Sequence, residues 1–537
     1  MNLLKKIFSV FSPSERKWFF AALAILILSA TSSAAFAIEE DGVFVPITGG
    51  SFREGFLGQP IAINPVTSGN SVDQEISEMV FGRLSDLLAA YEVSPDGRSY
   101  SLKLKENLKW DDGQPLTSDD VIFTIKTIQN PDVRSPLLKS WQGVAAERGS
   151  ELQIKLTLPL SYVFFINNVE RLPIIPKHIF GNIPTENFRL SDYNLEPVGS
   201  GPYKFKDFTK RKDGFISQYH FVPNENYVGE KPYIKDFYFN FFQNLDDVYQ
   251  ALKLHEINGF GSATPIDFDS TQFKGLAAQK IPLSDYYAVF FNQNSNPLLK
   301  DQNVRNALIS AVDKDQLIKE VLGGNGMEIN APGLTSTSSI AGDNSSFDQE
   351  SAKQSINTFK TKNKNEQIII SLSVPDVDFL KNIAGILKDS WQNVGVDQVN
   401  IVTFNPSDPT DATIKSRNYE MLLFGNILEN PVDIFPFWHS SQKLYPGSNL
   451  ALYQNLKVDN LIETVRQTSD SSKQSNLLTQ AQSMILNDQP AVFLFSLPYT
   501  YIHTKDLGGF NENFLTSPAE RFENVSSWYV AQVLVVK

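Results

Sequence analysis

One stretch of this chain, residues 110–130 with the sequence WDDGQPLTSDDVIFTIKTIQN, constrains its fold more than any other. Just before it, Leu102 and Leu104 alternate with Lys103, which is the pattern of a half-buried strand. Gly113 follows two aspartates and can adopt the positive φ that a tight turn requires. The stretch therefore predicts a strand that ends in a tight turn.

The residues after this turn carry the signals of a helix start. Thr117 can accept hydrogen bonds from the unpaired N–H groups of a first helical turn, and Asp120 can bond back to complete a capping box. The Asp120 carboxylate also complements the helix dipole. The apolar residues that follow at helical spacing are Val121, Ile122, Ile125 and Ile128. Strand, turn and amphipathic helix are thus predicted as one unit.

The order of residues in this unit, W-x-D-G-x-P-L-T-x-x-D-V, resembles the most distinctive motif of a known family. The family is the extracytoplasmic solute-binding proteins, family 5, of ABC importers, the class that binds oligopeptides, dipeptides or nickel. Three further segments resemble its motifs in the expected order: PVGSGPYKF at 197–205, NENYVGEKP at 224–232 and DQNVRNALISAVDKD at 301–315. These motifs identify the fold and do not mark a ligand site.

The resemblance implies an α/β protein with a two-lobed periplasmic-binding-protein-like fold (type II, cluster C), an extra inserted domain and two interlobe crossovers. The crossovers are expected near residues 286–292 and 491–497. The implied division is a signal or anchor segment at 1–37, domain I at 38–75, 196–285 and 491–537, the inserted domain II at 76–195, and domain III at 286–490. Apart from the resemblance, strands and helices alternate over 368–424, which predicts parallel strands with right-handed crossovers.

Two other segments carry local predictions. Residues 71–90 predict one helix, because apolar residues recur at helical spacing at Ile76, Val80, Leu84 and Leu87. Residues 334–365 are rich in Ser, Asn and Lys, and they predict a surface excursion with an amphipathic helix at 349–359.

Composition excludes several functional classes. The 537 residues have a formal net charge of −13, which argues against binding to nucleic acid and against broad adhesion to anionic lipid. Cysteine is absent, so the chain has no disulfide, no thiolate metal site, no Cys nucleophile and no lipidated Cys. The 39 Phe and 18 Tyr residues are consistent with a large core or with an aromatic-lined cleft.

The N-terminal segment joins basic residues to an apolar run at residues 18–37. Four Lys and Arg residues lie within the first 17 positions and three acidic residues follow at 39–41, an order that places the rest of the chain outside the cytoplasm. Residues 35–37, Ala-Phe-Ala, resemble a signal-peptidase site, whereas a run of about 20 residues can also remain as a membrane anchor. Both alternatives predict a periplasmic or cell-surface location for residues 38–537.

Signatures of common catalytic and metal sites are missing from the sequence. It has no G-x-S-x-G elbow, no G-x-x-x-x-G-K-[ST] phosphate loop and no H-E-x-x-H zinc motif, and its five His residues show no ligand spacing. We therefore expect no catalytic residue, no metal and no cofactor.

Residues 425–442, GNILENPVDIFPFWHSSQ, form the segment that we expect to line a ligand cleft. They follow a predicted strand at its carboxyl end, where open α/β sheets bind ligands, and they are aromatic and irregular in pattern. A packed surface loop is the alternative, and the resemblance favours the cleft. The complete set of cleft candidates is Ser51, Phe52, Phe260, Gly261, Phe424, Gly425, Asn426, Glu429, Asp433, Phe437 and Trp438.

One departure from the family's pattern concerns the ligand. Peptide-binding members often carry Gly-Trp and then an acidic residue before a proline, and that acid pairs with the α-amino group of the peptide. This chain has Asn426 after Gly425, and Asn430 stands before the proline. Glu429 or Asp433 could still meet an ammonium group.

The resemblance implies a monomeric, non-enzymatic protein that closes two lobes around a small solute and binds no nucleic acid. Its expected partners are an ABC permease with its ATPase, and the membrane through the N-terminal segment. Peptides are the expected ligand, since a peptide main chain can pair with exposed strand groups. The alternatives are the same scaffold with an oligosaccharide, an opine or a metal chelate, and a membrane-anchored hydrolase.

Overall fold

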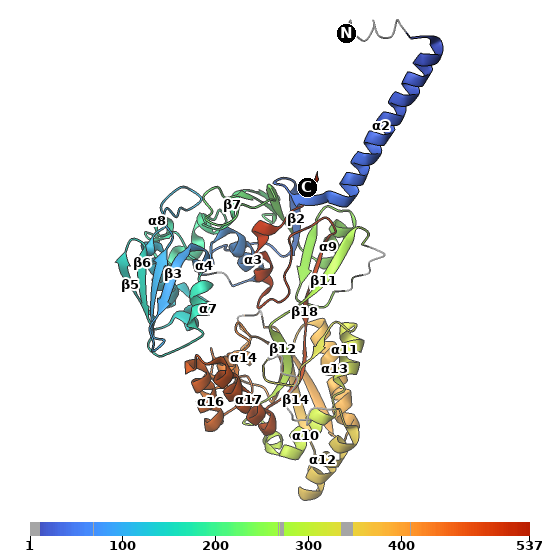
Figure 1. Cartoon of the computed structure of the whole chain (residues 1–537). Coiled ribbons are helices and arrows are strands. Elements are labelled where there is room, and N and C mark those ends of the chain that lie inside the picture. Colours follow the sequence, from blue (N-terminus) through green and yellow to red (C-terminus); the bar gives the residue numbers. More distant parts are fainter. Residues whose placement is uncertain are drawn as a thin grey trace.

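The computed structural model describes residues 11–67, 69–266, 268, 273–333, 347–406, 408 and 410–536. In this part of the chain the strands form four sheets, and Figure 1 shows them in two lobes. Of the predicted surface excursion, residues 334–346 lie outside the described residues. The helix predicted within it is confirmed as α12 (Gln349–Lys362).

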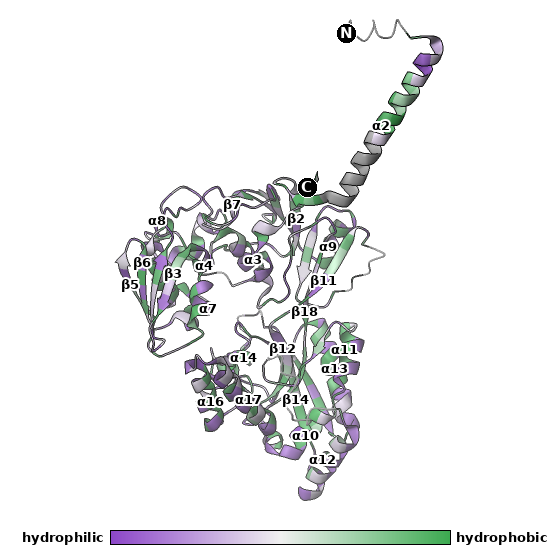
Figure 2. Cartoon of the chain, viewed as in Figure 1, coloured by the Kyte–Doolittle hydropathy of each residue, from purple (hydrophilic) through white to green (hydrophobic). Residues whose placement is uncertain are grey.

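Helix α2 (Pro13–Asp41) projects from the body of the protein and leads directly into strand β1 (Gly42–Pro46). Apolar side chains such as Ile25 and Leu28 are exposed on it, and Figure 2 shows hydrophobic residues in the coloured part of the helix after a hydrophilic start. Strand β1 pairs antiparallel with the last strand, β19 (Gln532–Val536). In the part of the chain that the structure describes, no helix combines the length and the apolarity needed to span a bilayer.

The larger sheet of the first lobe has seven strands in the order β11-β18-β10-β2-β9-β8-β7. Strand β2 pairs parallel with β9 and β10, and the other pairs are antiparallel. The strands are β2 (Ser51–Leu57), β7 (Tyr203–Lys210), β8 (Ile216–Pro223), β9 (Asp236–Phe242), β10 (Gly259–Ser262), β11 (Leu276–Pro282) and β18 (Pro498–Thr504). Helices α3 (Ser71–Val80) and α9 (Leu245–Lys253) cover opposite faces of this sheet. Tyr501 and Ile502 are consecutive residues of β18, so their side chains point to opposite faces. Tyr501 packs in the core that contains α3, and Ile502 packs in the core that contains α9.

A four-stranded antiparallel sheet, in the order β3-β4-β6-β5, forms the rest of the first lobe. The predicted capping box is confirmed: α5 (Ser118–Gln129) begins after Thr117, which bonds reciprocally with Asp120, and Gly113 has the expected positive φ of 88°. The elements of this unit are β3 (Leu88–Val93), β4 (Ser99–Leu104), β5 (Ala145–Ser150), β6 (Gln153–Thr157), α4 (Leu84–Leu87), α6 (Leu138–Trp141), α7 (Phe165–Glu170), α8 (Lys177–Phe180), and the 3-10 helices η1 (Pro131–Val133), η2 (Thr185–Leu190) and η3 (Asp192–Asn194).

The second lobe is built on a six-stranded sheet in the order β13-β17-β12-β16-β14-β15. Strand β14 pairs parallel with β15 and with β16, which confirms the predicted parallel strands, whereas β12 is antiparallel to both of its neighbours. The strands are β12 (Asp285–Phe291), β13 (Met327–Glu328), β14 (Ile369–Pro375), β15 (Gln398–Phe404), β16 (Met421–Ile427) and β17 (Ala491–Ser496).

Helices cover both faces of this sheet and bury two separate cores. One face carries α10 (Gln302–Ser310), α11 (Lys314–Leu322), α12 and α13 (Asp378–Asn393), and the other carries α15 (Phe435–Trp438), α16 (Leu456–Gln467) and α17 (Ser471–Asp488). The remaining elements of the chain are α14 (Thr413–Ser416) and the 3-10 helices η4 (Pro297–Lys300), η5 (Ser440–Gln442), η6 (Pro518–Phe522) and η7 (Val525–Ser527).

The chain crosses between the lobes twice, from β11 to β12 and from β17 back to β18. Strands β11 and β18 are neighbours in the seven-stranded sheet, and β12 and β17 are neighbours in the six-stranded sheet. The two crossings therefore run side by side, as Figure 1 shows at the junction of the lobes. The predicted two-lobed α/β fold with two crossovers is confirmed.

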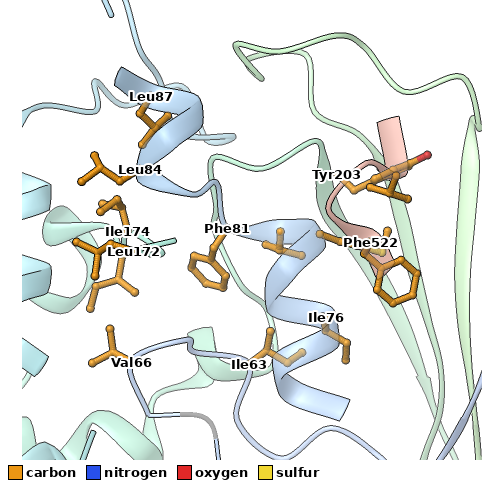
Figure 3. Close-up of a cluster of buried hydrophobic side chains, with 14 of the residues drawn as sticks. Ile63, Val66, Ile76, Phe81, Leu84, Leu87, Leu172, Ile174, Tyr203 and Phe522 are labelled. Carbon is orange, nitrogen blue, oxygen red and sulfur yellow. The ribbon is translucent and has the colours of Figure 1, made fainter. Parts of the chain in front are cut away.

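The prediction of one helix over residues 71–90 is wrong. Helix α3 ends at Val80, α4 spans only Leu84–Leu87, and Leu88 already begins β3. Between the helices Phe81 has extended backbone, with φ −101° and ψ 123°, and Figure 3 shows it in the buried cluster between them. Both helices bury a face in the same core, so the apolar spacing continues through the break.

Candidate functional site

The segment after β16 lies against the crossing between the lobes. The Leu428 N–H donates to the Ser284 carbonyl at 2.7 Å, and the Ser284 hydroxyl donates to the Leu428 carbonyl at 2.6 Å. On the other side, the Ser284 N–H donates to the carbonyl of Leu515 in the first lobe at 2.9 Å. This segment thus begins at the carboxyl end of β16, where the two lobes meet. The sequence predicted it at the carboxyl end of a strand.

Asp285 lies at one crossing between the lobes, and the sequence did not single it out. Its Oδ1 accepts from the Ser496 hydroxyl at 2.8 Å and from the Leu497 N–H at 3.2 Å, so it ties one crossing to the other. Burial raises the pKa of Asp285 to about 7, although these hydrogen bonds act in the opposite direction. The sequence feature that could have identified Asp285 is an acidic residue at the start of an otherwise apolar strand.

Replacing Asp285 by Asn should raise the free energy of unfolding at pH 8, by on the order of 1 kcal/mol. The folded-state pKa of about 7 lies above the ordinary 3.8, so the folded protein binds more protons and loses stability as pH rises between these values. Asn keeps an acceptor and never ionises, so the gain should be smaller at pH 5. Urea unfolding at both pH values measures it, with the exposed Asp213→Asn as control. A gain that does not grow with pH would contradict the shifted pKa.

Among the predicted residues at the end of β16, only some have exposed side chains. Phe424 and Gly425 are half-buried, and a Cβ on Gly425 would lie 3.0 Å from the ring of Tyr287. The Asn426 side chain is buried and donates to the Tyr286 hydroxyl at 3.0 Å. Glu429 is exposed.

The structure gives Asp433 a partner within the protein. Its carboxylate accepts from Arg466 Nη2 at 2.6 Å, from Arg466 Nε at 2.9 Å and from the Tyr162 hydroxyl at 2.9 Å. Because Asp433 is buried and already neutralised by a guanidinium, it does not offer the free carboxylate that an ammonium group would need. Of the two acids considered from the sequence, only Glu429 remains available.

The predicted irregular segment is more ordered than expected. Strand β16 continues to Ile427, and α15 and η5 occupy Phe435–Trp438 and Ser440–Gln442. Trp438 is fully buried in the core beneath, and its indole N–H donates to the Pro332 carbonyl at 3.2 Å. Phe437 is half-buried. The Trp438 side chain is thus part of the core.

The four candidates in the first lobe are spread along two neighbouring strands. Ser51 and Phe52 lie at the start of β2, the end away from the crossings, and Phe52 is fully buried against Phe237 and Trp528. Phe260 is buried under α9. A Cβ on Gly261 would lie 1.7 Å from the Tyr499 hydroxyl, so only glycine fits against that ring. Phe52 and Phe260 are therefore core residues.

Charged side chains from both lobes also gather where the lobes face each other beside the crossings, and the sequence gave no sign of this. Burial and the nearby Arg466 lower the pKa of Lys139 in the first lobe, while Glu429 and Asp433 of the second lobe act in the opposite direction. Arg171 bonds to the Thr516 hydroxyl at 2.8 Å and to Glu520 at 2.7 Å, next to the crossing. Within the described residues, no cluster of three or more His, Asp and Glu side chains could hold a metal ion.

Comparison with known proteins gives a consistent result. Residues 84–444 match the bacterial extracellular solute-binding proteins, family 5 Middle. The oligopeptide-binding protein AppA of Bacillus subtilis (strain 168) is 24% identical over 531 residues, covering 91% of this chain and 93% of that protein.

Solved structures resemble the fold over nearly the whole chain. AppA from Bacillus subtilis in complex with a nonapeptide has a TM-score of 0.72 at 23% identity, covering 91% of this chain and 100% of that chain. NikZ from Campylobacter jejuni in complex with Ni(L-His) has a TM-score of 0.71 at 24% identity, covering 89% and 99%. Because the family match spans more than half of the residues, this chain belongs to the family 5 bacterial extracellular solute-binding proteins.

Proposed function

We propose that this protein is the extracytoplasmic substrate-binding component of an ABC importer, and that it captures peptides by closure of its two lobes. The observation that carries the proposal is the pair of side-by-side crossings between two lobes in a chain of this family. Such a hinge lets the lobes move as rigid bodies around a guest. The closed form then delivers the peptide to a membrane permease, whose ATPase supplies the energy. The protein itself catalyses no reaction.

The ligand class is proposed from chemistry and from the relatives. A relative across nearly the whole chain is an oligopeptide-binding protein, and its solved structure holds a nonapeptide. Gly261, Phe424, Gly425, Glu429 and Phe437 are the predicted residues that we retain for the proposed site. Glu429, as an exposed carboxylate, is suited to a positive group of the ligand.

Peptide pools should raise the melting temperature of the full chain in a thermal-shift screen. A ligand that binds only the folded state stabilises it by about 2.7 kcal/mol at one hundred times its Kd. Because Asp433 is paired with Arg466, N-acetylated peptides should stabilise the protein nearly as well as free ones. Glu429→Gln should weaken any preference for free or basic peptides, with Glu225→Gln, at an exposed position of the first lobe, as control.

Other outcomes of the screen would indicate a different ligand class or an enzymatic role. Stabilisation by a nickel–histidine chelate, an opine or an oligosaccharide, with none by peptides, would replace the proposed ligand and keep the transport role. Mass spectrometry of the recovered ligands shows whether they are intact, and hydrolysis would contradict a non-enzymatic role.

The N-terminal segment is proposed to carry residues 38–537 across the cytoplasmic membrane. The proposal is supported by its basic start, its apolar run at 18–37 and the exported family to which the chain belongs. The mass of the protein recovered from cells that produce it distinguishes cleavage after Ala37 from retention as an anchor.

A further inference from the structure

A loop of the first lobe contacts the second lobe away from the two crossings. This loop, residues 158–164, joins β6 to α7. Within it the Tyr162 hydroxyl donates to Asp433 Oδ2 at 2.9 Å, and the Val163 N–H donates to the Arg466 carbonyl at 2.8 Å. Figure 1 shows α7 and α16, which flank this contact, to one side of the crossing strands. The lobes are thus joined at a third place, where the chain does not cross.

The second-lobe side of this contact is a well-defined ion pair. Arg466 binds Asp433 through two nitrogens, at 2.9 Å from Nε to Oδ1 and at 2.6 Å from Nη2 to Oδ2. The guanidinium lies over two rings, with its central carbon 3.8 Å from the centroid of Phe435 and 4.9 Å from that of Tyr162. Asp433 is only 6% exposed. Charge-assisted hydrogen bonds and cation–π contacts are strongest in such a partly desolvated place.

Apolar contact supports the same junction. Phe164, two residues after Tyr162, packs against the core of the second lobe, and the two rings meet edge to face with centroids 5.8 Å apart. Burial raises the pKa of the Tyr162 hydroxyl, and the carboxylate of Asp433 raises it further, so this hydroxyl remains a donor at neutral pH. The loop therefore docks through a hydroxyl, a backbone N–H and an aromatic ring.

We propose that Tyr162 and the Asp433–Arg466 pair form an interlobe clasp that holds the two lobes against each other at this third place, and that the arrangement so held is the closed one. All of its contacts are made by groups of the chain itself, so the clasp favours closure without ligand atoms. A ligand can then populate the closed state with a smaller difference between its affinities for the closed and the open state. The inference rests on the proposed closure of the lobes and adds the residues that set its equilibrium.

The clasp can be tested without a ligand, because the chain contains no cysteine. Leu190→Cys and Leu456→Cys, at positions 78% and 73% exposed in the two lobes, accept a donor and an acceptor dye. In this labelled background Tyr162→Phe should shift the energy-transfer distribution to lower efficiency, since the lobes open when the hydroxyl is lost. Tyr91→Phe removes an exposed hydroxyl on the same first-lobe unit and should leave the distribution unchanged. If Tyr162→Phe gives the wild-type distribution, the clasp is overturned.

A second readout separates the clasp from the peptide proposal. For a peptide that stabilises the wild type, Tyr162→Phe should weaken binding about ten-fold, mainly through faster dissociation, as expected for loss of one charge-assisted hydrogen bond. Unchanged dissociation in this variant would overturn the clasp and leave peptide binding intact. If no peptide binds but Tyr162→Phe still opens the lobes, the peptide proposal fails and the clasp stands.

Discussion

Replacing Arg521 by Met should lower the free energy of unfolding by about 3–5 kcal/mol at pH 8. Arg521 is 1% exposed and pairs with two buried carboxylates, Glu54 on β2 at 2.9 Å and Glu75 on α3. The Tyr501 hydroxyl donates to Glu54 at 2.9 Å. Removal of the Arg521 guanidinium leaves both carboxylates buried without the cation that neutralises them, which is far more costly than losing the pair itself.

The loss should depend on pH in a defined direction. Burial raises the pKa of Glu54 to about 7 even beside Arg521, and burial also raises the pKa of Glu75. Without the guanidinium both pKa values should rise further above the ordinary value of 4.5. A folded state that binds more protons loses stability as pH rises through this window, so Arg521→Met should be less damaging at pH 5 than at pH 8.

Urea unfolding of the wild type and Arg521→Met at the two pH values gives the measurement. Adding Glu54→Gln to Arg521→Met should recover part of the loss at pH 8. Arg211→Met is the matched control, because Arg211 is half-exposed and pairs with an equally exposed Asp213, and it should cost less than about 1 kcal/mol. An equal loss at pH 5 and pH 8 would show that uncompensated carboxylates are not its cause.

Replacing Gly199 by Ala should destabilise the protein by about 3 kcal/mol, at the upper end of overpacking effects. A Cβ at this position would lie 1.9 Å from the carbonyl oxygen of Val80, the last residue of α3. Gly199 cannot move away, because its N–H donates to Asp111 Oδ2 at 3.0 Å and its carbonyl accepts from the Asp111 N–H at 2.9 Å. The clash is with backbone, so a side-chain rotation does not relieve it.

Gly385→Ala is the control for this prediction. Gly385 lies within helix α13, and a Cβ there has no atom within 4 Å, so this change should be neutral or stabilise the protein by up to about 1 kcal/mol. Thermal unfolding of both variants compares a glycine required by packing with one that is not. Equal melting temperatures for the two variants would contradict the packing role of Gly199.

The contacts of Gly199 show why two distant sequence motifs occur together. The turn at Asp111 belongs to the strand–turn–helix unit, and Gly199 belongs to the PVGSGPYKF segment, 88 residues later. Each motif could be recognised in the sequence, and their order supported the family resemblance and the two-lobed fold. The sequence did not reveal that the two motifs meet at the end of α3, nor that the helix predicted over 71–90 breaks there.

The structure places the residues of the predicted site in different surroundings, which the sequence did not distinguish. The predicted alternation of strands and helices correctly placed the segment after β16 at the carboxyl ends of parallel strands, where Leu428 contacts the crossing. Aromatic residues in that segment were taken as cleft-lining, yet Trp438 is fully buried. Asp433 was considered for the ligand, but Arg466, 33 residues away, and Tyr162, 271 residues away, already hold it.

By itself the sequence determined the features that depend on near neighbours. The capping box of Thr117 and Asp120 and the turn at Gly113 follow from spacing over a few residues, and the parallel strands around β14 follow from the alternation of successive strands and helices. Only the tertiary structure decided which charges are partners, as for Glu54 and Arg521, 467 residues apart. An acid looks the same in the sequence whether it will face solvent, a guanidinium or a ligand, because its environment is set by elements that folding brings together.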